Sequence, residues 1–167
     1  KRRIYPYGNI SSHVVGYTDI EGRGLSGIER GLDESLSQGI DIYLSIDINL
    51  QFAIREELIN ITDKFSANSG LVLVVDITNS EIISMISLPD FDPNNNQTFK
   101  KNNLFNRTIQ GNYEMGSIFK PLTIALGIDK EIIDRDTVFD VSKPINGIKD
   151  FHPFYGSLGI KEIIVKS

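Results

Sequence analysis

The sequence predicts an α+β fold, in which a layer of antiparallel strands is packed against helices. Residues 71–76 and 81–88 are rich in β-forming side chains and are joined by a short link, a pattern typical of a hairpin. Apolar side chains recur every three or four residues in 49–67 and again from Ser117 onward, which predicts two helices. Since each of these elements has an apolar face, we expect them to pack on one another.

The composition is that of a soluble globular domain. The 167 residues include 22 acidic and 17 basic side chains, which gives a net charge of −5, and no cysteine. The acidic balance argues against a nucleic-acid partner, and the lack of cysteine excludes thiol catalysis, cysteine zinc sites and disulfides. No apolar run reaches the ~18 residues of a membrane span. Because Lys1 is not a natural start, we expect a piece of a longer protein, whose membrane anchor could lie elsewhere.

Residues 1–39 are rich in glycine and are predicted to form an extended, loop-rich lead-in without a core of its own. Within it, Ser26 and Glu29 have the spacing of a capping box, in which the serine caps a backbone N–H and the glutamate bonds back. This pattern predicts a short helix that begins at Ser26. An ordinary solvated turn explains the same residues equally well.

Residues 40–46 alternate between apolar and polar side chains, which predicts a strand with one buried face. Asp47 or Asn49 is then expected to cap a helix over 49–67. The apolar stripe of this helix is predicted to pack on the sheet and consists of Leu50, Ile54, Leu58, Ile61 and Phe65.

The first run of the hairpin, residues 71–75, is almost continuously apolar and predicts a central strand covered on both faces. Residues 90–106 follow as a polar stretch that is too long for an ordinary turn. Such a stretch is either a functional loop or a mobile surface loop, and the sequence favours neither. Further along, residues 134–158 are predicted to be rich in loops, and 159–167 to start a third helix.

Ser117 and Lys120 form the pair of residues whose chemistry best suits catalysis. Residues three apart on a helix share a face, and a lysine held neutral by desolvation or cationic neighbours can accept the serine proton. Pro121 is tolerated only in the first turn of a helix, so Ser117 is expected near the N-terminus of a well-buried helix. There the helix dipole favours negative charge on the serine oxygen. The spacing alone is weak evidence, because a capping serine and a solvated lysine produce it too.

The surrounding blocks strengthen this interpretation, because they resemble the penicillin-binding proteins, in which Ser-x-x-Lys is followed by Ser-x-Asn and Lys-Thr-Gly. The segments that are similar to class B members of this family are 2–6, 13–16, 24–29, 87–94, Asn106-Arg107 and 113–121. The opening Arg-Arg-x-Tyr-Pro and the Ser-Leu-Pro-Asp-Phe-Asp-Pro-Asn run resemble most the division-specific septal type of proteobacteria.

The chain departs from this family in three places. Met115 stands where the family has proline, and Asn79-Ser80 stands where it has Thr-Gly. Because asparagine tolerates left-handed dihedrals, the hairpin turn is expected to be retained. No Lys-Thr-Gly occurs, and Ser167 resembles the first serine of Ser-x-Asn.

The resemblance implies the N-terminal half of a penicillin-binding transpeptidase or β-lactamase-like fold. Residues 1–39 would be the lead-in from an N-terminal pedestal region, and 40–167 the first part of the transpeptidase domain, truncated at the start of the Ser-x-Asn motif. The implied activity is that of a serine D,D-transpeptidase that cross-links peptidoglycan stem peptides during septal cell-wall synthesis, with no metal or organic cofactor. This chain alone is expected to be inactive.

The family's site residues map onto three positions of this chain. Ser117 would be the nucleophile and, through its backbone N–H, an oxyanion donor, and Lys120 would be the base. Both would bind substrate and β-lactam antibiotics, which acylate the serine. Ser167 would be a further catalytic residue.

By the same resemblance, the parent protein would lie in the bacterial inner membrane, with its body on the periplasmic face. Its anchor would lie outside this chain, and its partners would be cell-division membrane proteins. The unpaired edge of the hairpin makes a strand-edge dimer possible.

A β-lactam sensor or a noncatalytic scaffold of the same fold is the alternative function. The blocks in residues 2–6 and 24–29 favour the class B enzyme, and a class A β-lactamase has no role for so long a lead-in. Other sites are poorly supported, because residues 111–117 lack the lysine of a phosphate-binding loop and His13 and His152 lack metal-ligand spacing.

Overall fold

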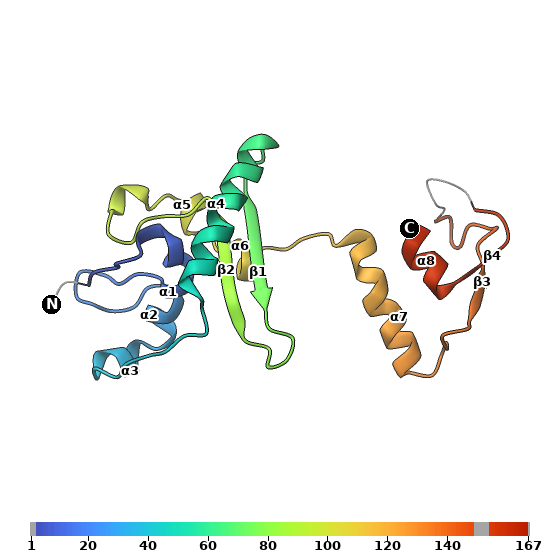
Figure 1. The fold of residues 1–167 in the computed structure, drawn as a ribbon, viewed down its shortest axis with the longest axis horizontal. Helices are drawn as coiled ribbons and strands as arrows, with labels where there is room; N and C mark the ends of the chain where they lie inside the picture. The colour runs from blue at the N-terminus through green and yellow to red at the C-terminus, as the bar shows by residue number, and fades with distance from the viewer. Residues whose placement is uncertain (1–2, 149–153, 167) are drawn as a thin grey trace. The chain divides into compact units, whose positions relative to one another are not determined.

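The computed structural model describes residues 3–148 and 154–166 (Figure 1). The chain divides into two compact units, Lys1–Asn112 and Tyr113–Ser167. Each unit combines helices with a pair of antiparallel strands, which confirms the predicted α+β class.

The opening residues fold into four short helices: the 3₁₀ turn η1 (Gly8–Ser11), α1 (Ser12–Val15), α2 (Gly27–Gly31) and α3 (Asp33–Ser37). Ser12, Val14 and Glu29 are buried, so this segment contributes to the core of its unit, contrary to the expected extended lead-in. The helix predicted at Ser26 is confirmed as α2. The capping box is wrong, because the Ser26 side chain makes no capping hydrogen bond, and the Glu29 carboxylate forms an ion pair with Arg3 (Nη2 to Oε2, 3.0 Å).

The long helix α4 (Ile48–Lys64) lies along the hairpin, and its cap is Asp47 (Figure 1). The Asp47 carboxylate accepts the N–H groups of Asn49 (2.9 Å) and Leu50 (3.0 Å), as predicted. The predicted stripe is correct for its first three residues, which are half-buried, and wrong for Ile61 and Phe65, which are exposed. Toward the end of the helix, Leu58 and Thr62 contact the strand that begins at Gly70. A Cβ added at Gly70 would lie 2.9 Å from each of these side chains.

The predicted strand over residues 40–46 is wrong. Within the described part of the chain this segment has no regular secondary structure and forms no ladder, and its hydrogen bonds to the sheet are at its end. There the Ser45 hydroxyl donates to the carbonyl of Ile82 (2.7 Å), and the Asp47 N–H donates to that of Ile83 (2.9 Å). An alternating pattern gives a segment one apolar face, but a strand also needs a neighbour along its whole length.

The predicted hairpin is confirmed as β1 (Gly70–Val75) paired with β2 (Ile82–Leu88), with Leu71 opposite Ser87. Its turn contains one left-handed residue, which is Ser80 (φ 65°) and not Asn79. The Asn79 side chain instead accepts the N–H of Glu81 (2.9 Å).

The expectation that the first strand is central is wrong for the residues described. In that part of the chain β1 pairs with β2 alone, and alternate side chains of β1 face outward. Leu71, Leu73 and Val75 are exposed, so the hairpin has one covered face and one open apolar face.

The polar stretch after the hairpin is folded onto the opening residues and is not a free surface loop. It contains the turn η2 (Asn96–Thr98) and the helix α5 (Lys101–Leu104). Its first carboxylate, that of Asp90, is held by Arg55 (Nε to Oδ2, 2.7 Å). Phe91 is only 2% exposed, and it joins an aromatic cluster with His13, Tyr17 and Phe99 at centroid distances of 4.6 to 5.6 Å.

The buried position of His13 predicts how stability depends on pH. Burial lowers the pKa of His13, and the hydrogen bond from Nε2–H to the carbonyl of Asn103 (2.8 Å) offsets this only in part. The folded chain therefore keeps His13 neutral where the unfolded chain, with a pKa of ~6.5, is already protonated. We expect the free energy of unfolding to fall as the pH drops from about 6.5 toward the lower pKa of the folded state.

Urea denaturation at a series of pH values measures this effect. In His13→Asn, which cannot titrate, the decline should be smaller than in the unsubstituted chain. A decline of equal steepness in both would contradict the assignment to His13.

The unit Tyr113–Ser167 contains the turn η3 (Gly116–Phe119), α7 (Lys120–Asp129), β3 (Val138–Asp140), β4 (Ser157–Gly159) and α8 (Ile160–Lys166). The predicted second and third helices are confirmed as α7 and α8. The strands β3 and β4 pair with each other, although β3 and the first two residues of β4 lie in the segment 134–158 that was predicted to be rich in loops. Within its own unit, α7 has no fully buried residue, and Leu122 and Leu126 are exposed.

Candidate active site

Ser117 and Lys120 lie at the start of one helix, as Pro121 predicts. Ser117 is in the turn η3, Lys120 is the first residue of α7, and Pro121 stands in the first turn of α7. The Lys120 N–H donates to the carbonyl of Ser117. Because residues three apart in a 3₁₀ turn are eclipsed, both side chains leave the helix on the same side. Ser117 is exposed and Lys120 is half-buried.

Two backbone positions before the serine set the entry into this turn. Gly116 has φ 54°, a left-handed conformation that glycine adopts without strain, although an added Cβ would meet nothing within 4 Å. Met115, which stands where the resemblance places a proline, has φ −71°. That value lies within the range that a proline ring imposes, so the methionine retains the local backbone geometry.

The residues Asn106 and Arg107 connect the hairpin to the segment that leads toward Ser117. Asn106 caps the helix α6 (Arg107–Gln110) through the N–H of Thr108 (3.1 Å). The backbone N–H of Arg107 donates to the hydroxyl of Ser87 in β2 (3.0 Å). The Arg107 guanidinium donates to the carbonyls of Asn102 and Phe105 (3.1 Å each) and to the Asn102 side chain. Asn106 and Arg107, one of the segments that resemble the family, are thus buried and hydrogen-bonded within the unit Lys1–Asn112.

Gln51 is a structural residue that the sequence reasoning missed. It is 1% exposed, and its carboxamide makes four hydrogen bonds. Nε2 donates to the carbonyls of Ile10 (3.0 Å) and Met85 (2.8 Å), and Oε1 accepts from the Ser84 hydroxyl (2.8 Å) and the Met85 N–H (2.9 Å). The available signal was its position, because Gln51 lies three residues before Ile54 and seven before Leu58, on the helix face that carries the apolar stripe.

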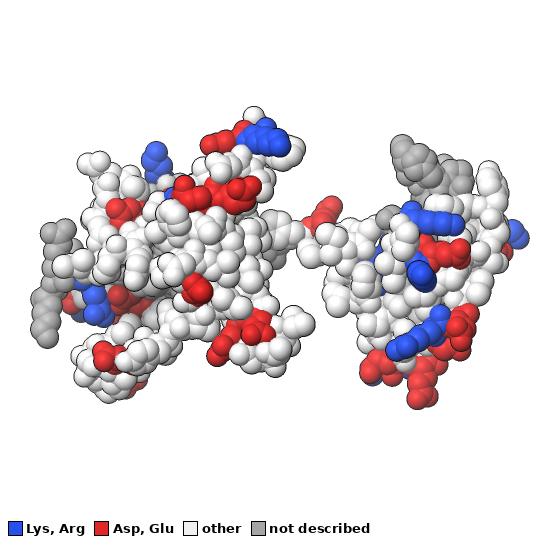
Figure 2. Space-filling view, in the orientation of Figure 1, with Lys and Arg blue, Asp and Glu red and all other residues white. Residues whose placement is uncertain are grey.

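The structure does not test every predicted site residue. Ser167 lies outside the described residues, as does His152. Among the residues that are described, no three His, Asp or Glu side chains are grouped to hold a metal ion, and no helix is long and apolar enough to cross a membrane. On the face that Figure 2 shows, acidic and basic side chains are scattered over both units.

Comparisons with known proteins agree on one family. The family described as "Penicillin binding protein transpeptidase domain" matches residues 70–167. The FtsI protein of Caulobacter vibrioides, named a probable peptidoglycan D,D-transpeptidase, is 32% identical over 98% of this chain and 29% of its own length. FtsI of Escherichia coli K12 is 29% identical over 99% of this chain and 33% of its own length. PenA of Neisseria gonorrhoeae is 30% identical, with coverages of 99% and 34%.

A solved structure supports the fold. The crystal structure of Pseudomonas aeruginosa PBP2 in complex with WCK 5153 matches with a TM-score of 0.70 and 22% identity, over 95% of this chain and 43% of that one. The present chain spans about a third of the length of the curated relatives that it matches.

Proposed function

Since this chain belongs to the penicillin-binding protein transpeptidase family, we propose that it is the first part of a serine D,D-transpeptidase that cross-links peptidoglycan stem peptides. The observation that carries the proposal is the position of Ser117 and Lys120 at the N-terminus of α7, within the matched residues 70–167. The names of the relatives, peptidoglycan D,D-transpeptidases, support the same activity.

In this proposal Ser117 is the nucleophile and Lys120 the base. The Ser117 oxygen attacks the carbonyl carbon of the penultimate D-alanine of a stem peptide, and Lys120 accepts the hydroxyl proton. The bond to the terminal D-alanine then breaks, and the departing amine takes up a proton. An amine of a neighbouring stem peptide attacks the resulting ester, which forms the cross-link and restores the Ser117 hydroxyl. The backbone N–H of Ser117 contributes one oxyanion donor.

The same serine would be acylated by β-lactam antibiotics, with Ser117 and Lys120 in their binding site. We assign Ser167 to the start of the Ser-x-Asn motif. The domain assignment follows: residues 1–39 form the lead-in from a pedestal region, and 40–167 the first part of the transpeptidase domain. The close packing of residues 3–39 with the rest of their unit is compatible with a lead-in that is rigidly attached.

We further propose a septal role in the parent protein, supported by the similarity to proteins named FtsI. This role implies a body on the periplasmic face of the bacterial inner membrane and cell-division membrane proteins as partners. Among the residues described, β1 pairs only with β2, and this supports a strand-edge dimer, because an unpaired edge offers backbone groups to a second strand.

Covalent labelling with a fluorescent penicillin tests the proposed chemistry. The protein to use is a chain extended through the expected Lys-Thr-Gly segment. Trypsin cleaves after Arg107 and Lys130 but not between Lys120 and Pro121, so the label should lie in the peptide 108–130. A label in any other peptide would contradict the assignment of Ser117. Labelling without release of D-alanine from a D-Ala-D-Ala peptide would indicate a sensor or scaffold.

The 167-residue chain by itself is expected to be a poor penicillin binder. In the family one oxyanion donor and the substrate-clamping strand belong to the Lys-Thr-Gly segment, which these residues lack. Loss of one such donor typically slows the reaction by ~100- to 1,000-fold. Intact mass spectrometry should therefore show acylation at least that much slower than in the extended chain. Equal rates in both chains would mean that this segment alone organises the nucleophile.

A further inference from the structure

The unit Tyr113–Ser167 contains a two-residue turn, Asn146-Gly147, that the transpeptidase chemistry does not use. The residues on either side exchange both backbone hydrogen bonds. The Ile148 N–H donates to the carbonyl of Ile145 (2.9 Å), and the Ile145 N–H donates to that of Ile148 (3.1 Å). Asn146 has φ 51° and Gly147 has φ 80°, the left-handed values of a type I′ turn. All four residues are exposed, so the turn lies at the surface of its unit.

The backbone nitrogen that follows Asn146 is unhindered. Within the described residues, neither the Asn146 carboxamide nor the Gly147 N–H makes a hydrogen bond. A Cβ added at Gly147 would meet nothing within 4 Å, so the space beside this nitrogen is open. Because two exposed backbone hydrogen bonds and no buried side chain hold the turn, it opens at a low cost in free energy. The Gly147 nitrogen can then reach the carbonyl carbon of the Asn146 side chain.

The asparagine in the turn of the β1–β2 hairpin, Asn79, is held in place by contrast. Its Oδ1 accepts the N–H of Glu81 (2.9 Å), and its Nδ2 donates to the Glu81 carboxylate (3.0 Å). The next backbone nitrogen, that of Ser80, donates its N–H to the carbonyl of Asp76 (2.8 Å). Both groups that would have to approach each other are therefore engaged. Asn146 is also the one asparagine in the sequence that a glycine follows.

We propose that Asn146 is a site of spontaneous deamidation, driven by attack of the Gly147 nitrogen on the side-chain carbonyl carbon. A bond forms between this nitrogen and Cγ of Asn146, and the bond from Cγ to Nδ2 breaks. Nδ2 leaves as ammonia, together with the proton of the Gly147 N–H, and a five-membered succinimide ring remains. Water then opens the ring at either carbonyl, which leaves an aspartate or an isoaspartate at position 146. Asparagine is among the thermally labile residues of proteins.

The isoaspartate product would break the turn. Its main chain runs through the former side chain, which adds one methylene group to the backbone. The paired hydrogen bonds between Ile145 and Ile148 require a loop of two residues with ordinary backbone spacing. The modified chain therefore loses this pairing, and either product adds one negative charge to the net charge of −5.

Incubation of the 167-residue chain at mildly alkaline pH, followed by tryptic peptide mapping, tests this proposal. Trypsin cleaves after Arg135 and Lys149 but not before Pro144, so the turn lies in the peptide 136–149. This peptide should acquire the mass increase of deamidation and contain isoaspartate. Modification at Asn79 should be at least about tenfold slower, because its hydrogen bonds must break first.

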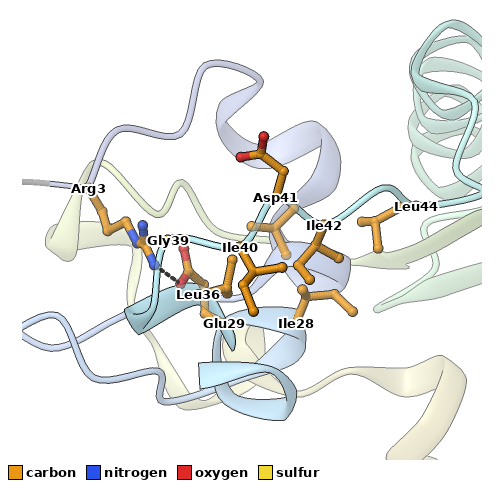
Figure 3. A pocket seen from close by; sticks show the side chains of 10 residues that line it. Arg3, Ile28, Glu29, Leu36, Gly39, Ile40, Asp41, Ile42 and Leu44 are labelled. Carbon is orange, nitrogen blue, oxygen red and sulfur yellow. Dashed lines mark ion pairs between the residues drawn. The ribbon is translucent and has the colours of Figure 1, made fainter. Parts of the chain in front are cut away.

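Two variants test the route of the reaction. Gly147→Ala places a Cβ beside the attacking nitrogen and should slow the modification by at least about tenfold. Asn146→Gln should abolish it, since the longer side chain does not close a five-membered ring. The methyl NMR signals of Ile28, Ile40 and Ile42, which line the cavity in the unit Lys1–Asn112 shown in Figure 3, should be unchanged in both variants. Unchanged signals show that each substitution acts locally.

Equal rates of deamidation at Asn146 and Asn79 would overturn the proposal, and so would an unchanged rate in Gly147→Ala. Formation of aspartate at position 146 without isoaspartate would also overturn it, because direct hydrolysis of the carboxamide gives aspartate alone. Deamidation of Asn146 that occurs in urea but not in the folded chain would show that the fold keeps the turn closed, which equally contradicts the proposal.

Discussion

Ser117→Ala is expected to abolish covalent labelling by penicillin, and Lys120→Ala to slow it by about 10²- to 10⁴-fold, in a chain extended through Lys-Thr-Gly. The first substitution removes the attacking oxygen at the start of α7, so no ester can form. The second leaves the hydroxyl but removes the group that takes its proton, and a positioned base contributes a factor of that size. Stopped-flow or gel-based acylation rates measure both effects.

A matched control separates catalysis from folding in this experiment. Lys130 is an exposed lysine at the end of the same helix, so Lys130→Ala should leave the acylation rate within twofold of the unsubstituted protein. Lys120→Arg keeps the charge but cannot act as a neutral base, and it should be nearly as slow as Lys120→Ala. A rapid Lys120→Ala variant would exclude Lys120 as the base.

Gln51→Leu is expected to destabilise the unit Lys1–Asn112 by about 3–5 kcal/mol. The substitution leaves the N–H of Met85 and the hydroxyl of Ser84 without an acceptor in the core, and the carbonyls of Ile10 and Met85 without a donor. Each buried group left unsatisfied costs ~1–3 kcal/mol, and the larger apolar side chain offsets only part of this. Because a domain of this size is stable by ~5–15 kcal/mol, the loss is a large share of the total.

Urea denaturation followed by circular dichroism, together with hydrogen exchange at the Met85 amide, measures this loss. Gln38→Leu, at an exposed glutamine after α3, is the control and should change the free energy of unfolding by less than ~0.5 kcal/mol. Gln51→Glu adds a pH test. Burial should raise the pKa of the introduced carboxyl, so its stability should fall as the pH rises above ~4.3. A stable Gln51→Leu variant would show that these hydrogen bonds contribute little.

The parts of the fold that local pattern specifies could be predicted from the sequence. Asp47 caps α4, and the hairpin pairs 70–75 with 82–88, because a cap and a short turn depend on neighbouring residues. The predicted strand at 40–46 failed because a ladder depends on a partner distant in sequence. The burial of Glu29 could not be predicted either, since its partner Arg3 precedes it by many residues.

The candidate site likewise combines features that neighbouring residues predict with features that depend on distant segments. The place of Ser117 and Lys120 at a helix start follows from Pro121, a local restraint, and the structure has it there. Helical periodicity places Gln51 on the face of Ile54 and Leu58, but its hydrogen-bond partners come from segments that meet only in the folded chain and could not be predicted. The burial of α7 depends on segments that are distant from it in the sequence, so its apolar pattern alone does not predict which of its side chains are covered.

The aromatic cluster joins residues that a ribosome produces at different times. Phe91 follows Tyr17 by 74 positions, and both rings pack edge to face at 5.6 Å between centroids. Synthesis at ~5–20 residues per second implies that Tyr17 emerges about 4 to 15 s before Phe91. During that interval the rings of His13 and Tyr17 lack the contacts with Phe91 and Phe99 that cover them in the folded chain.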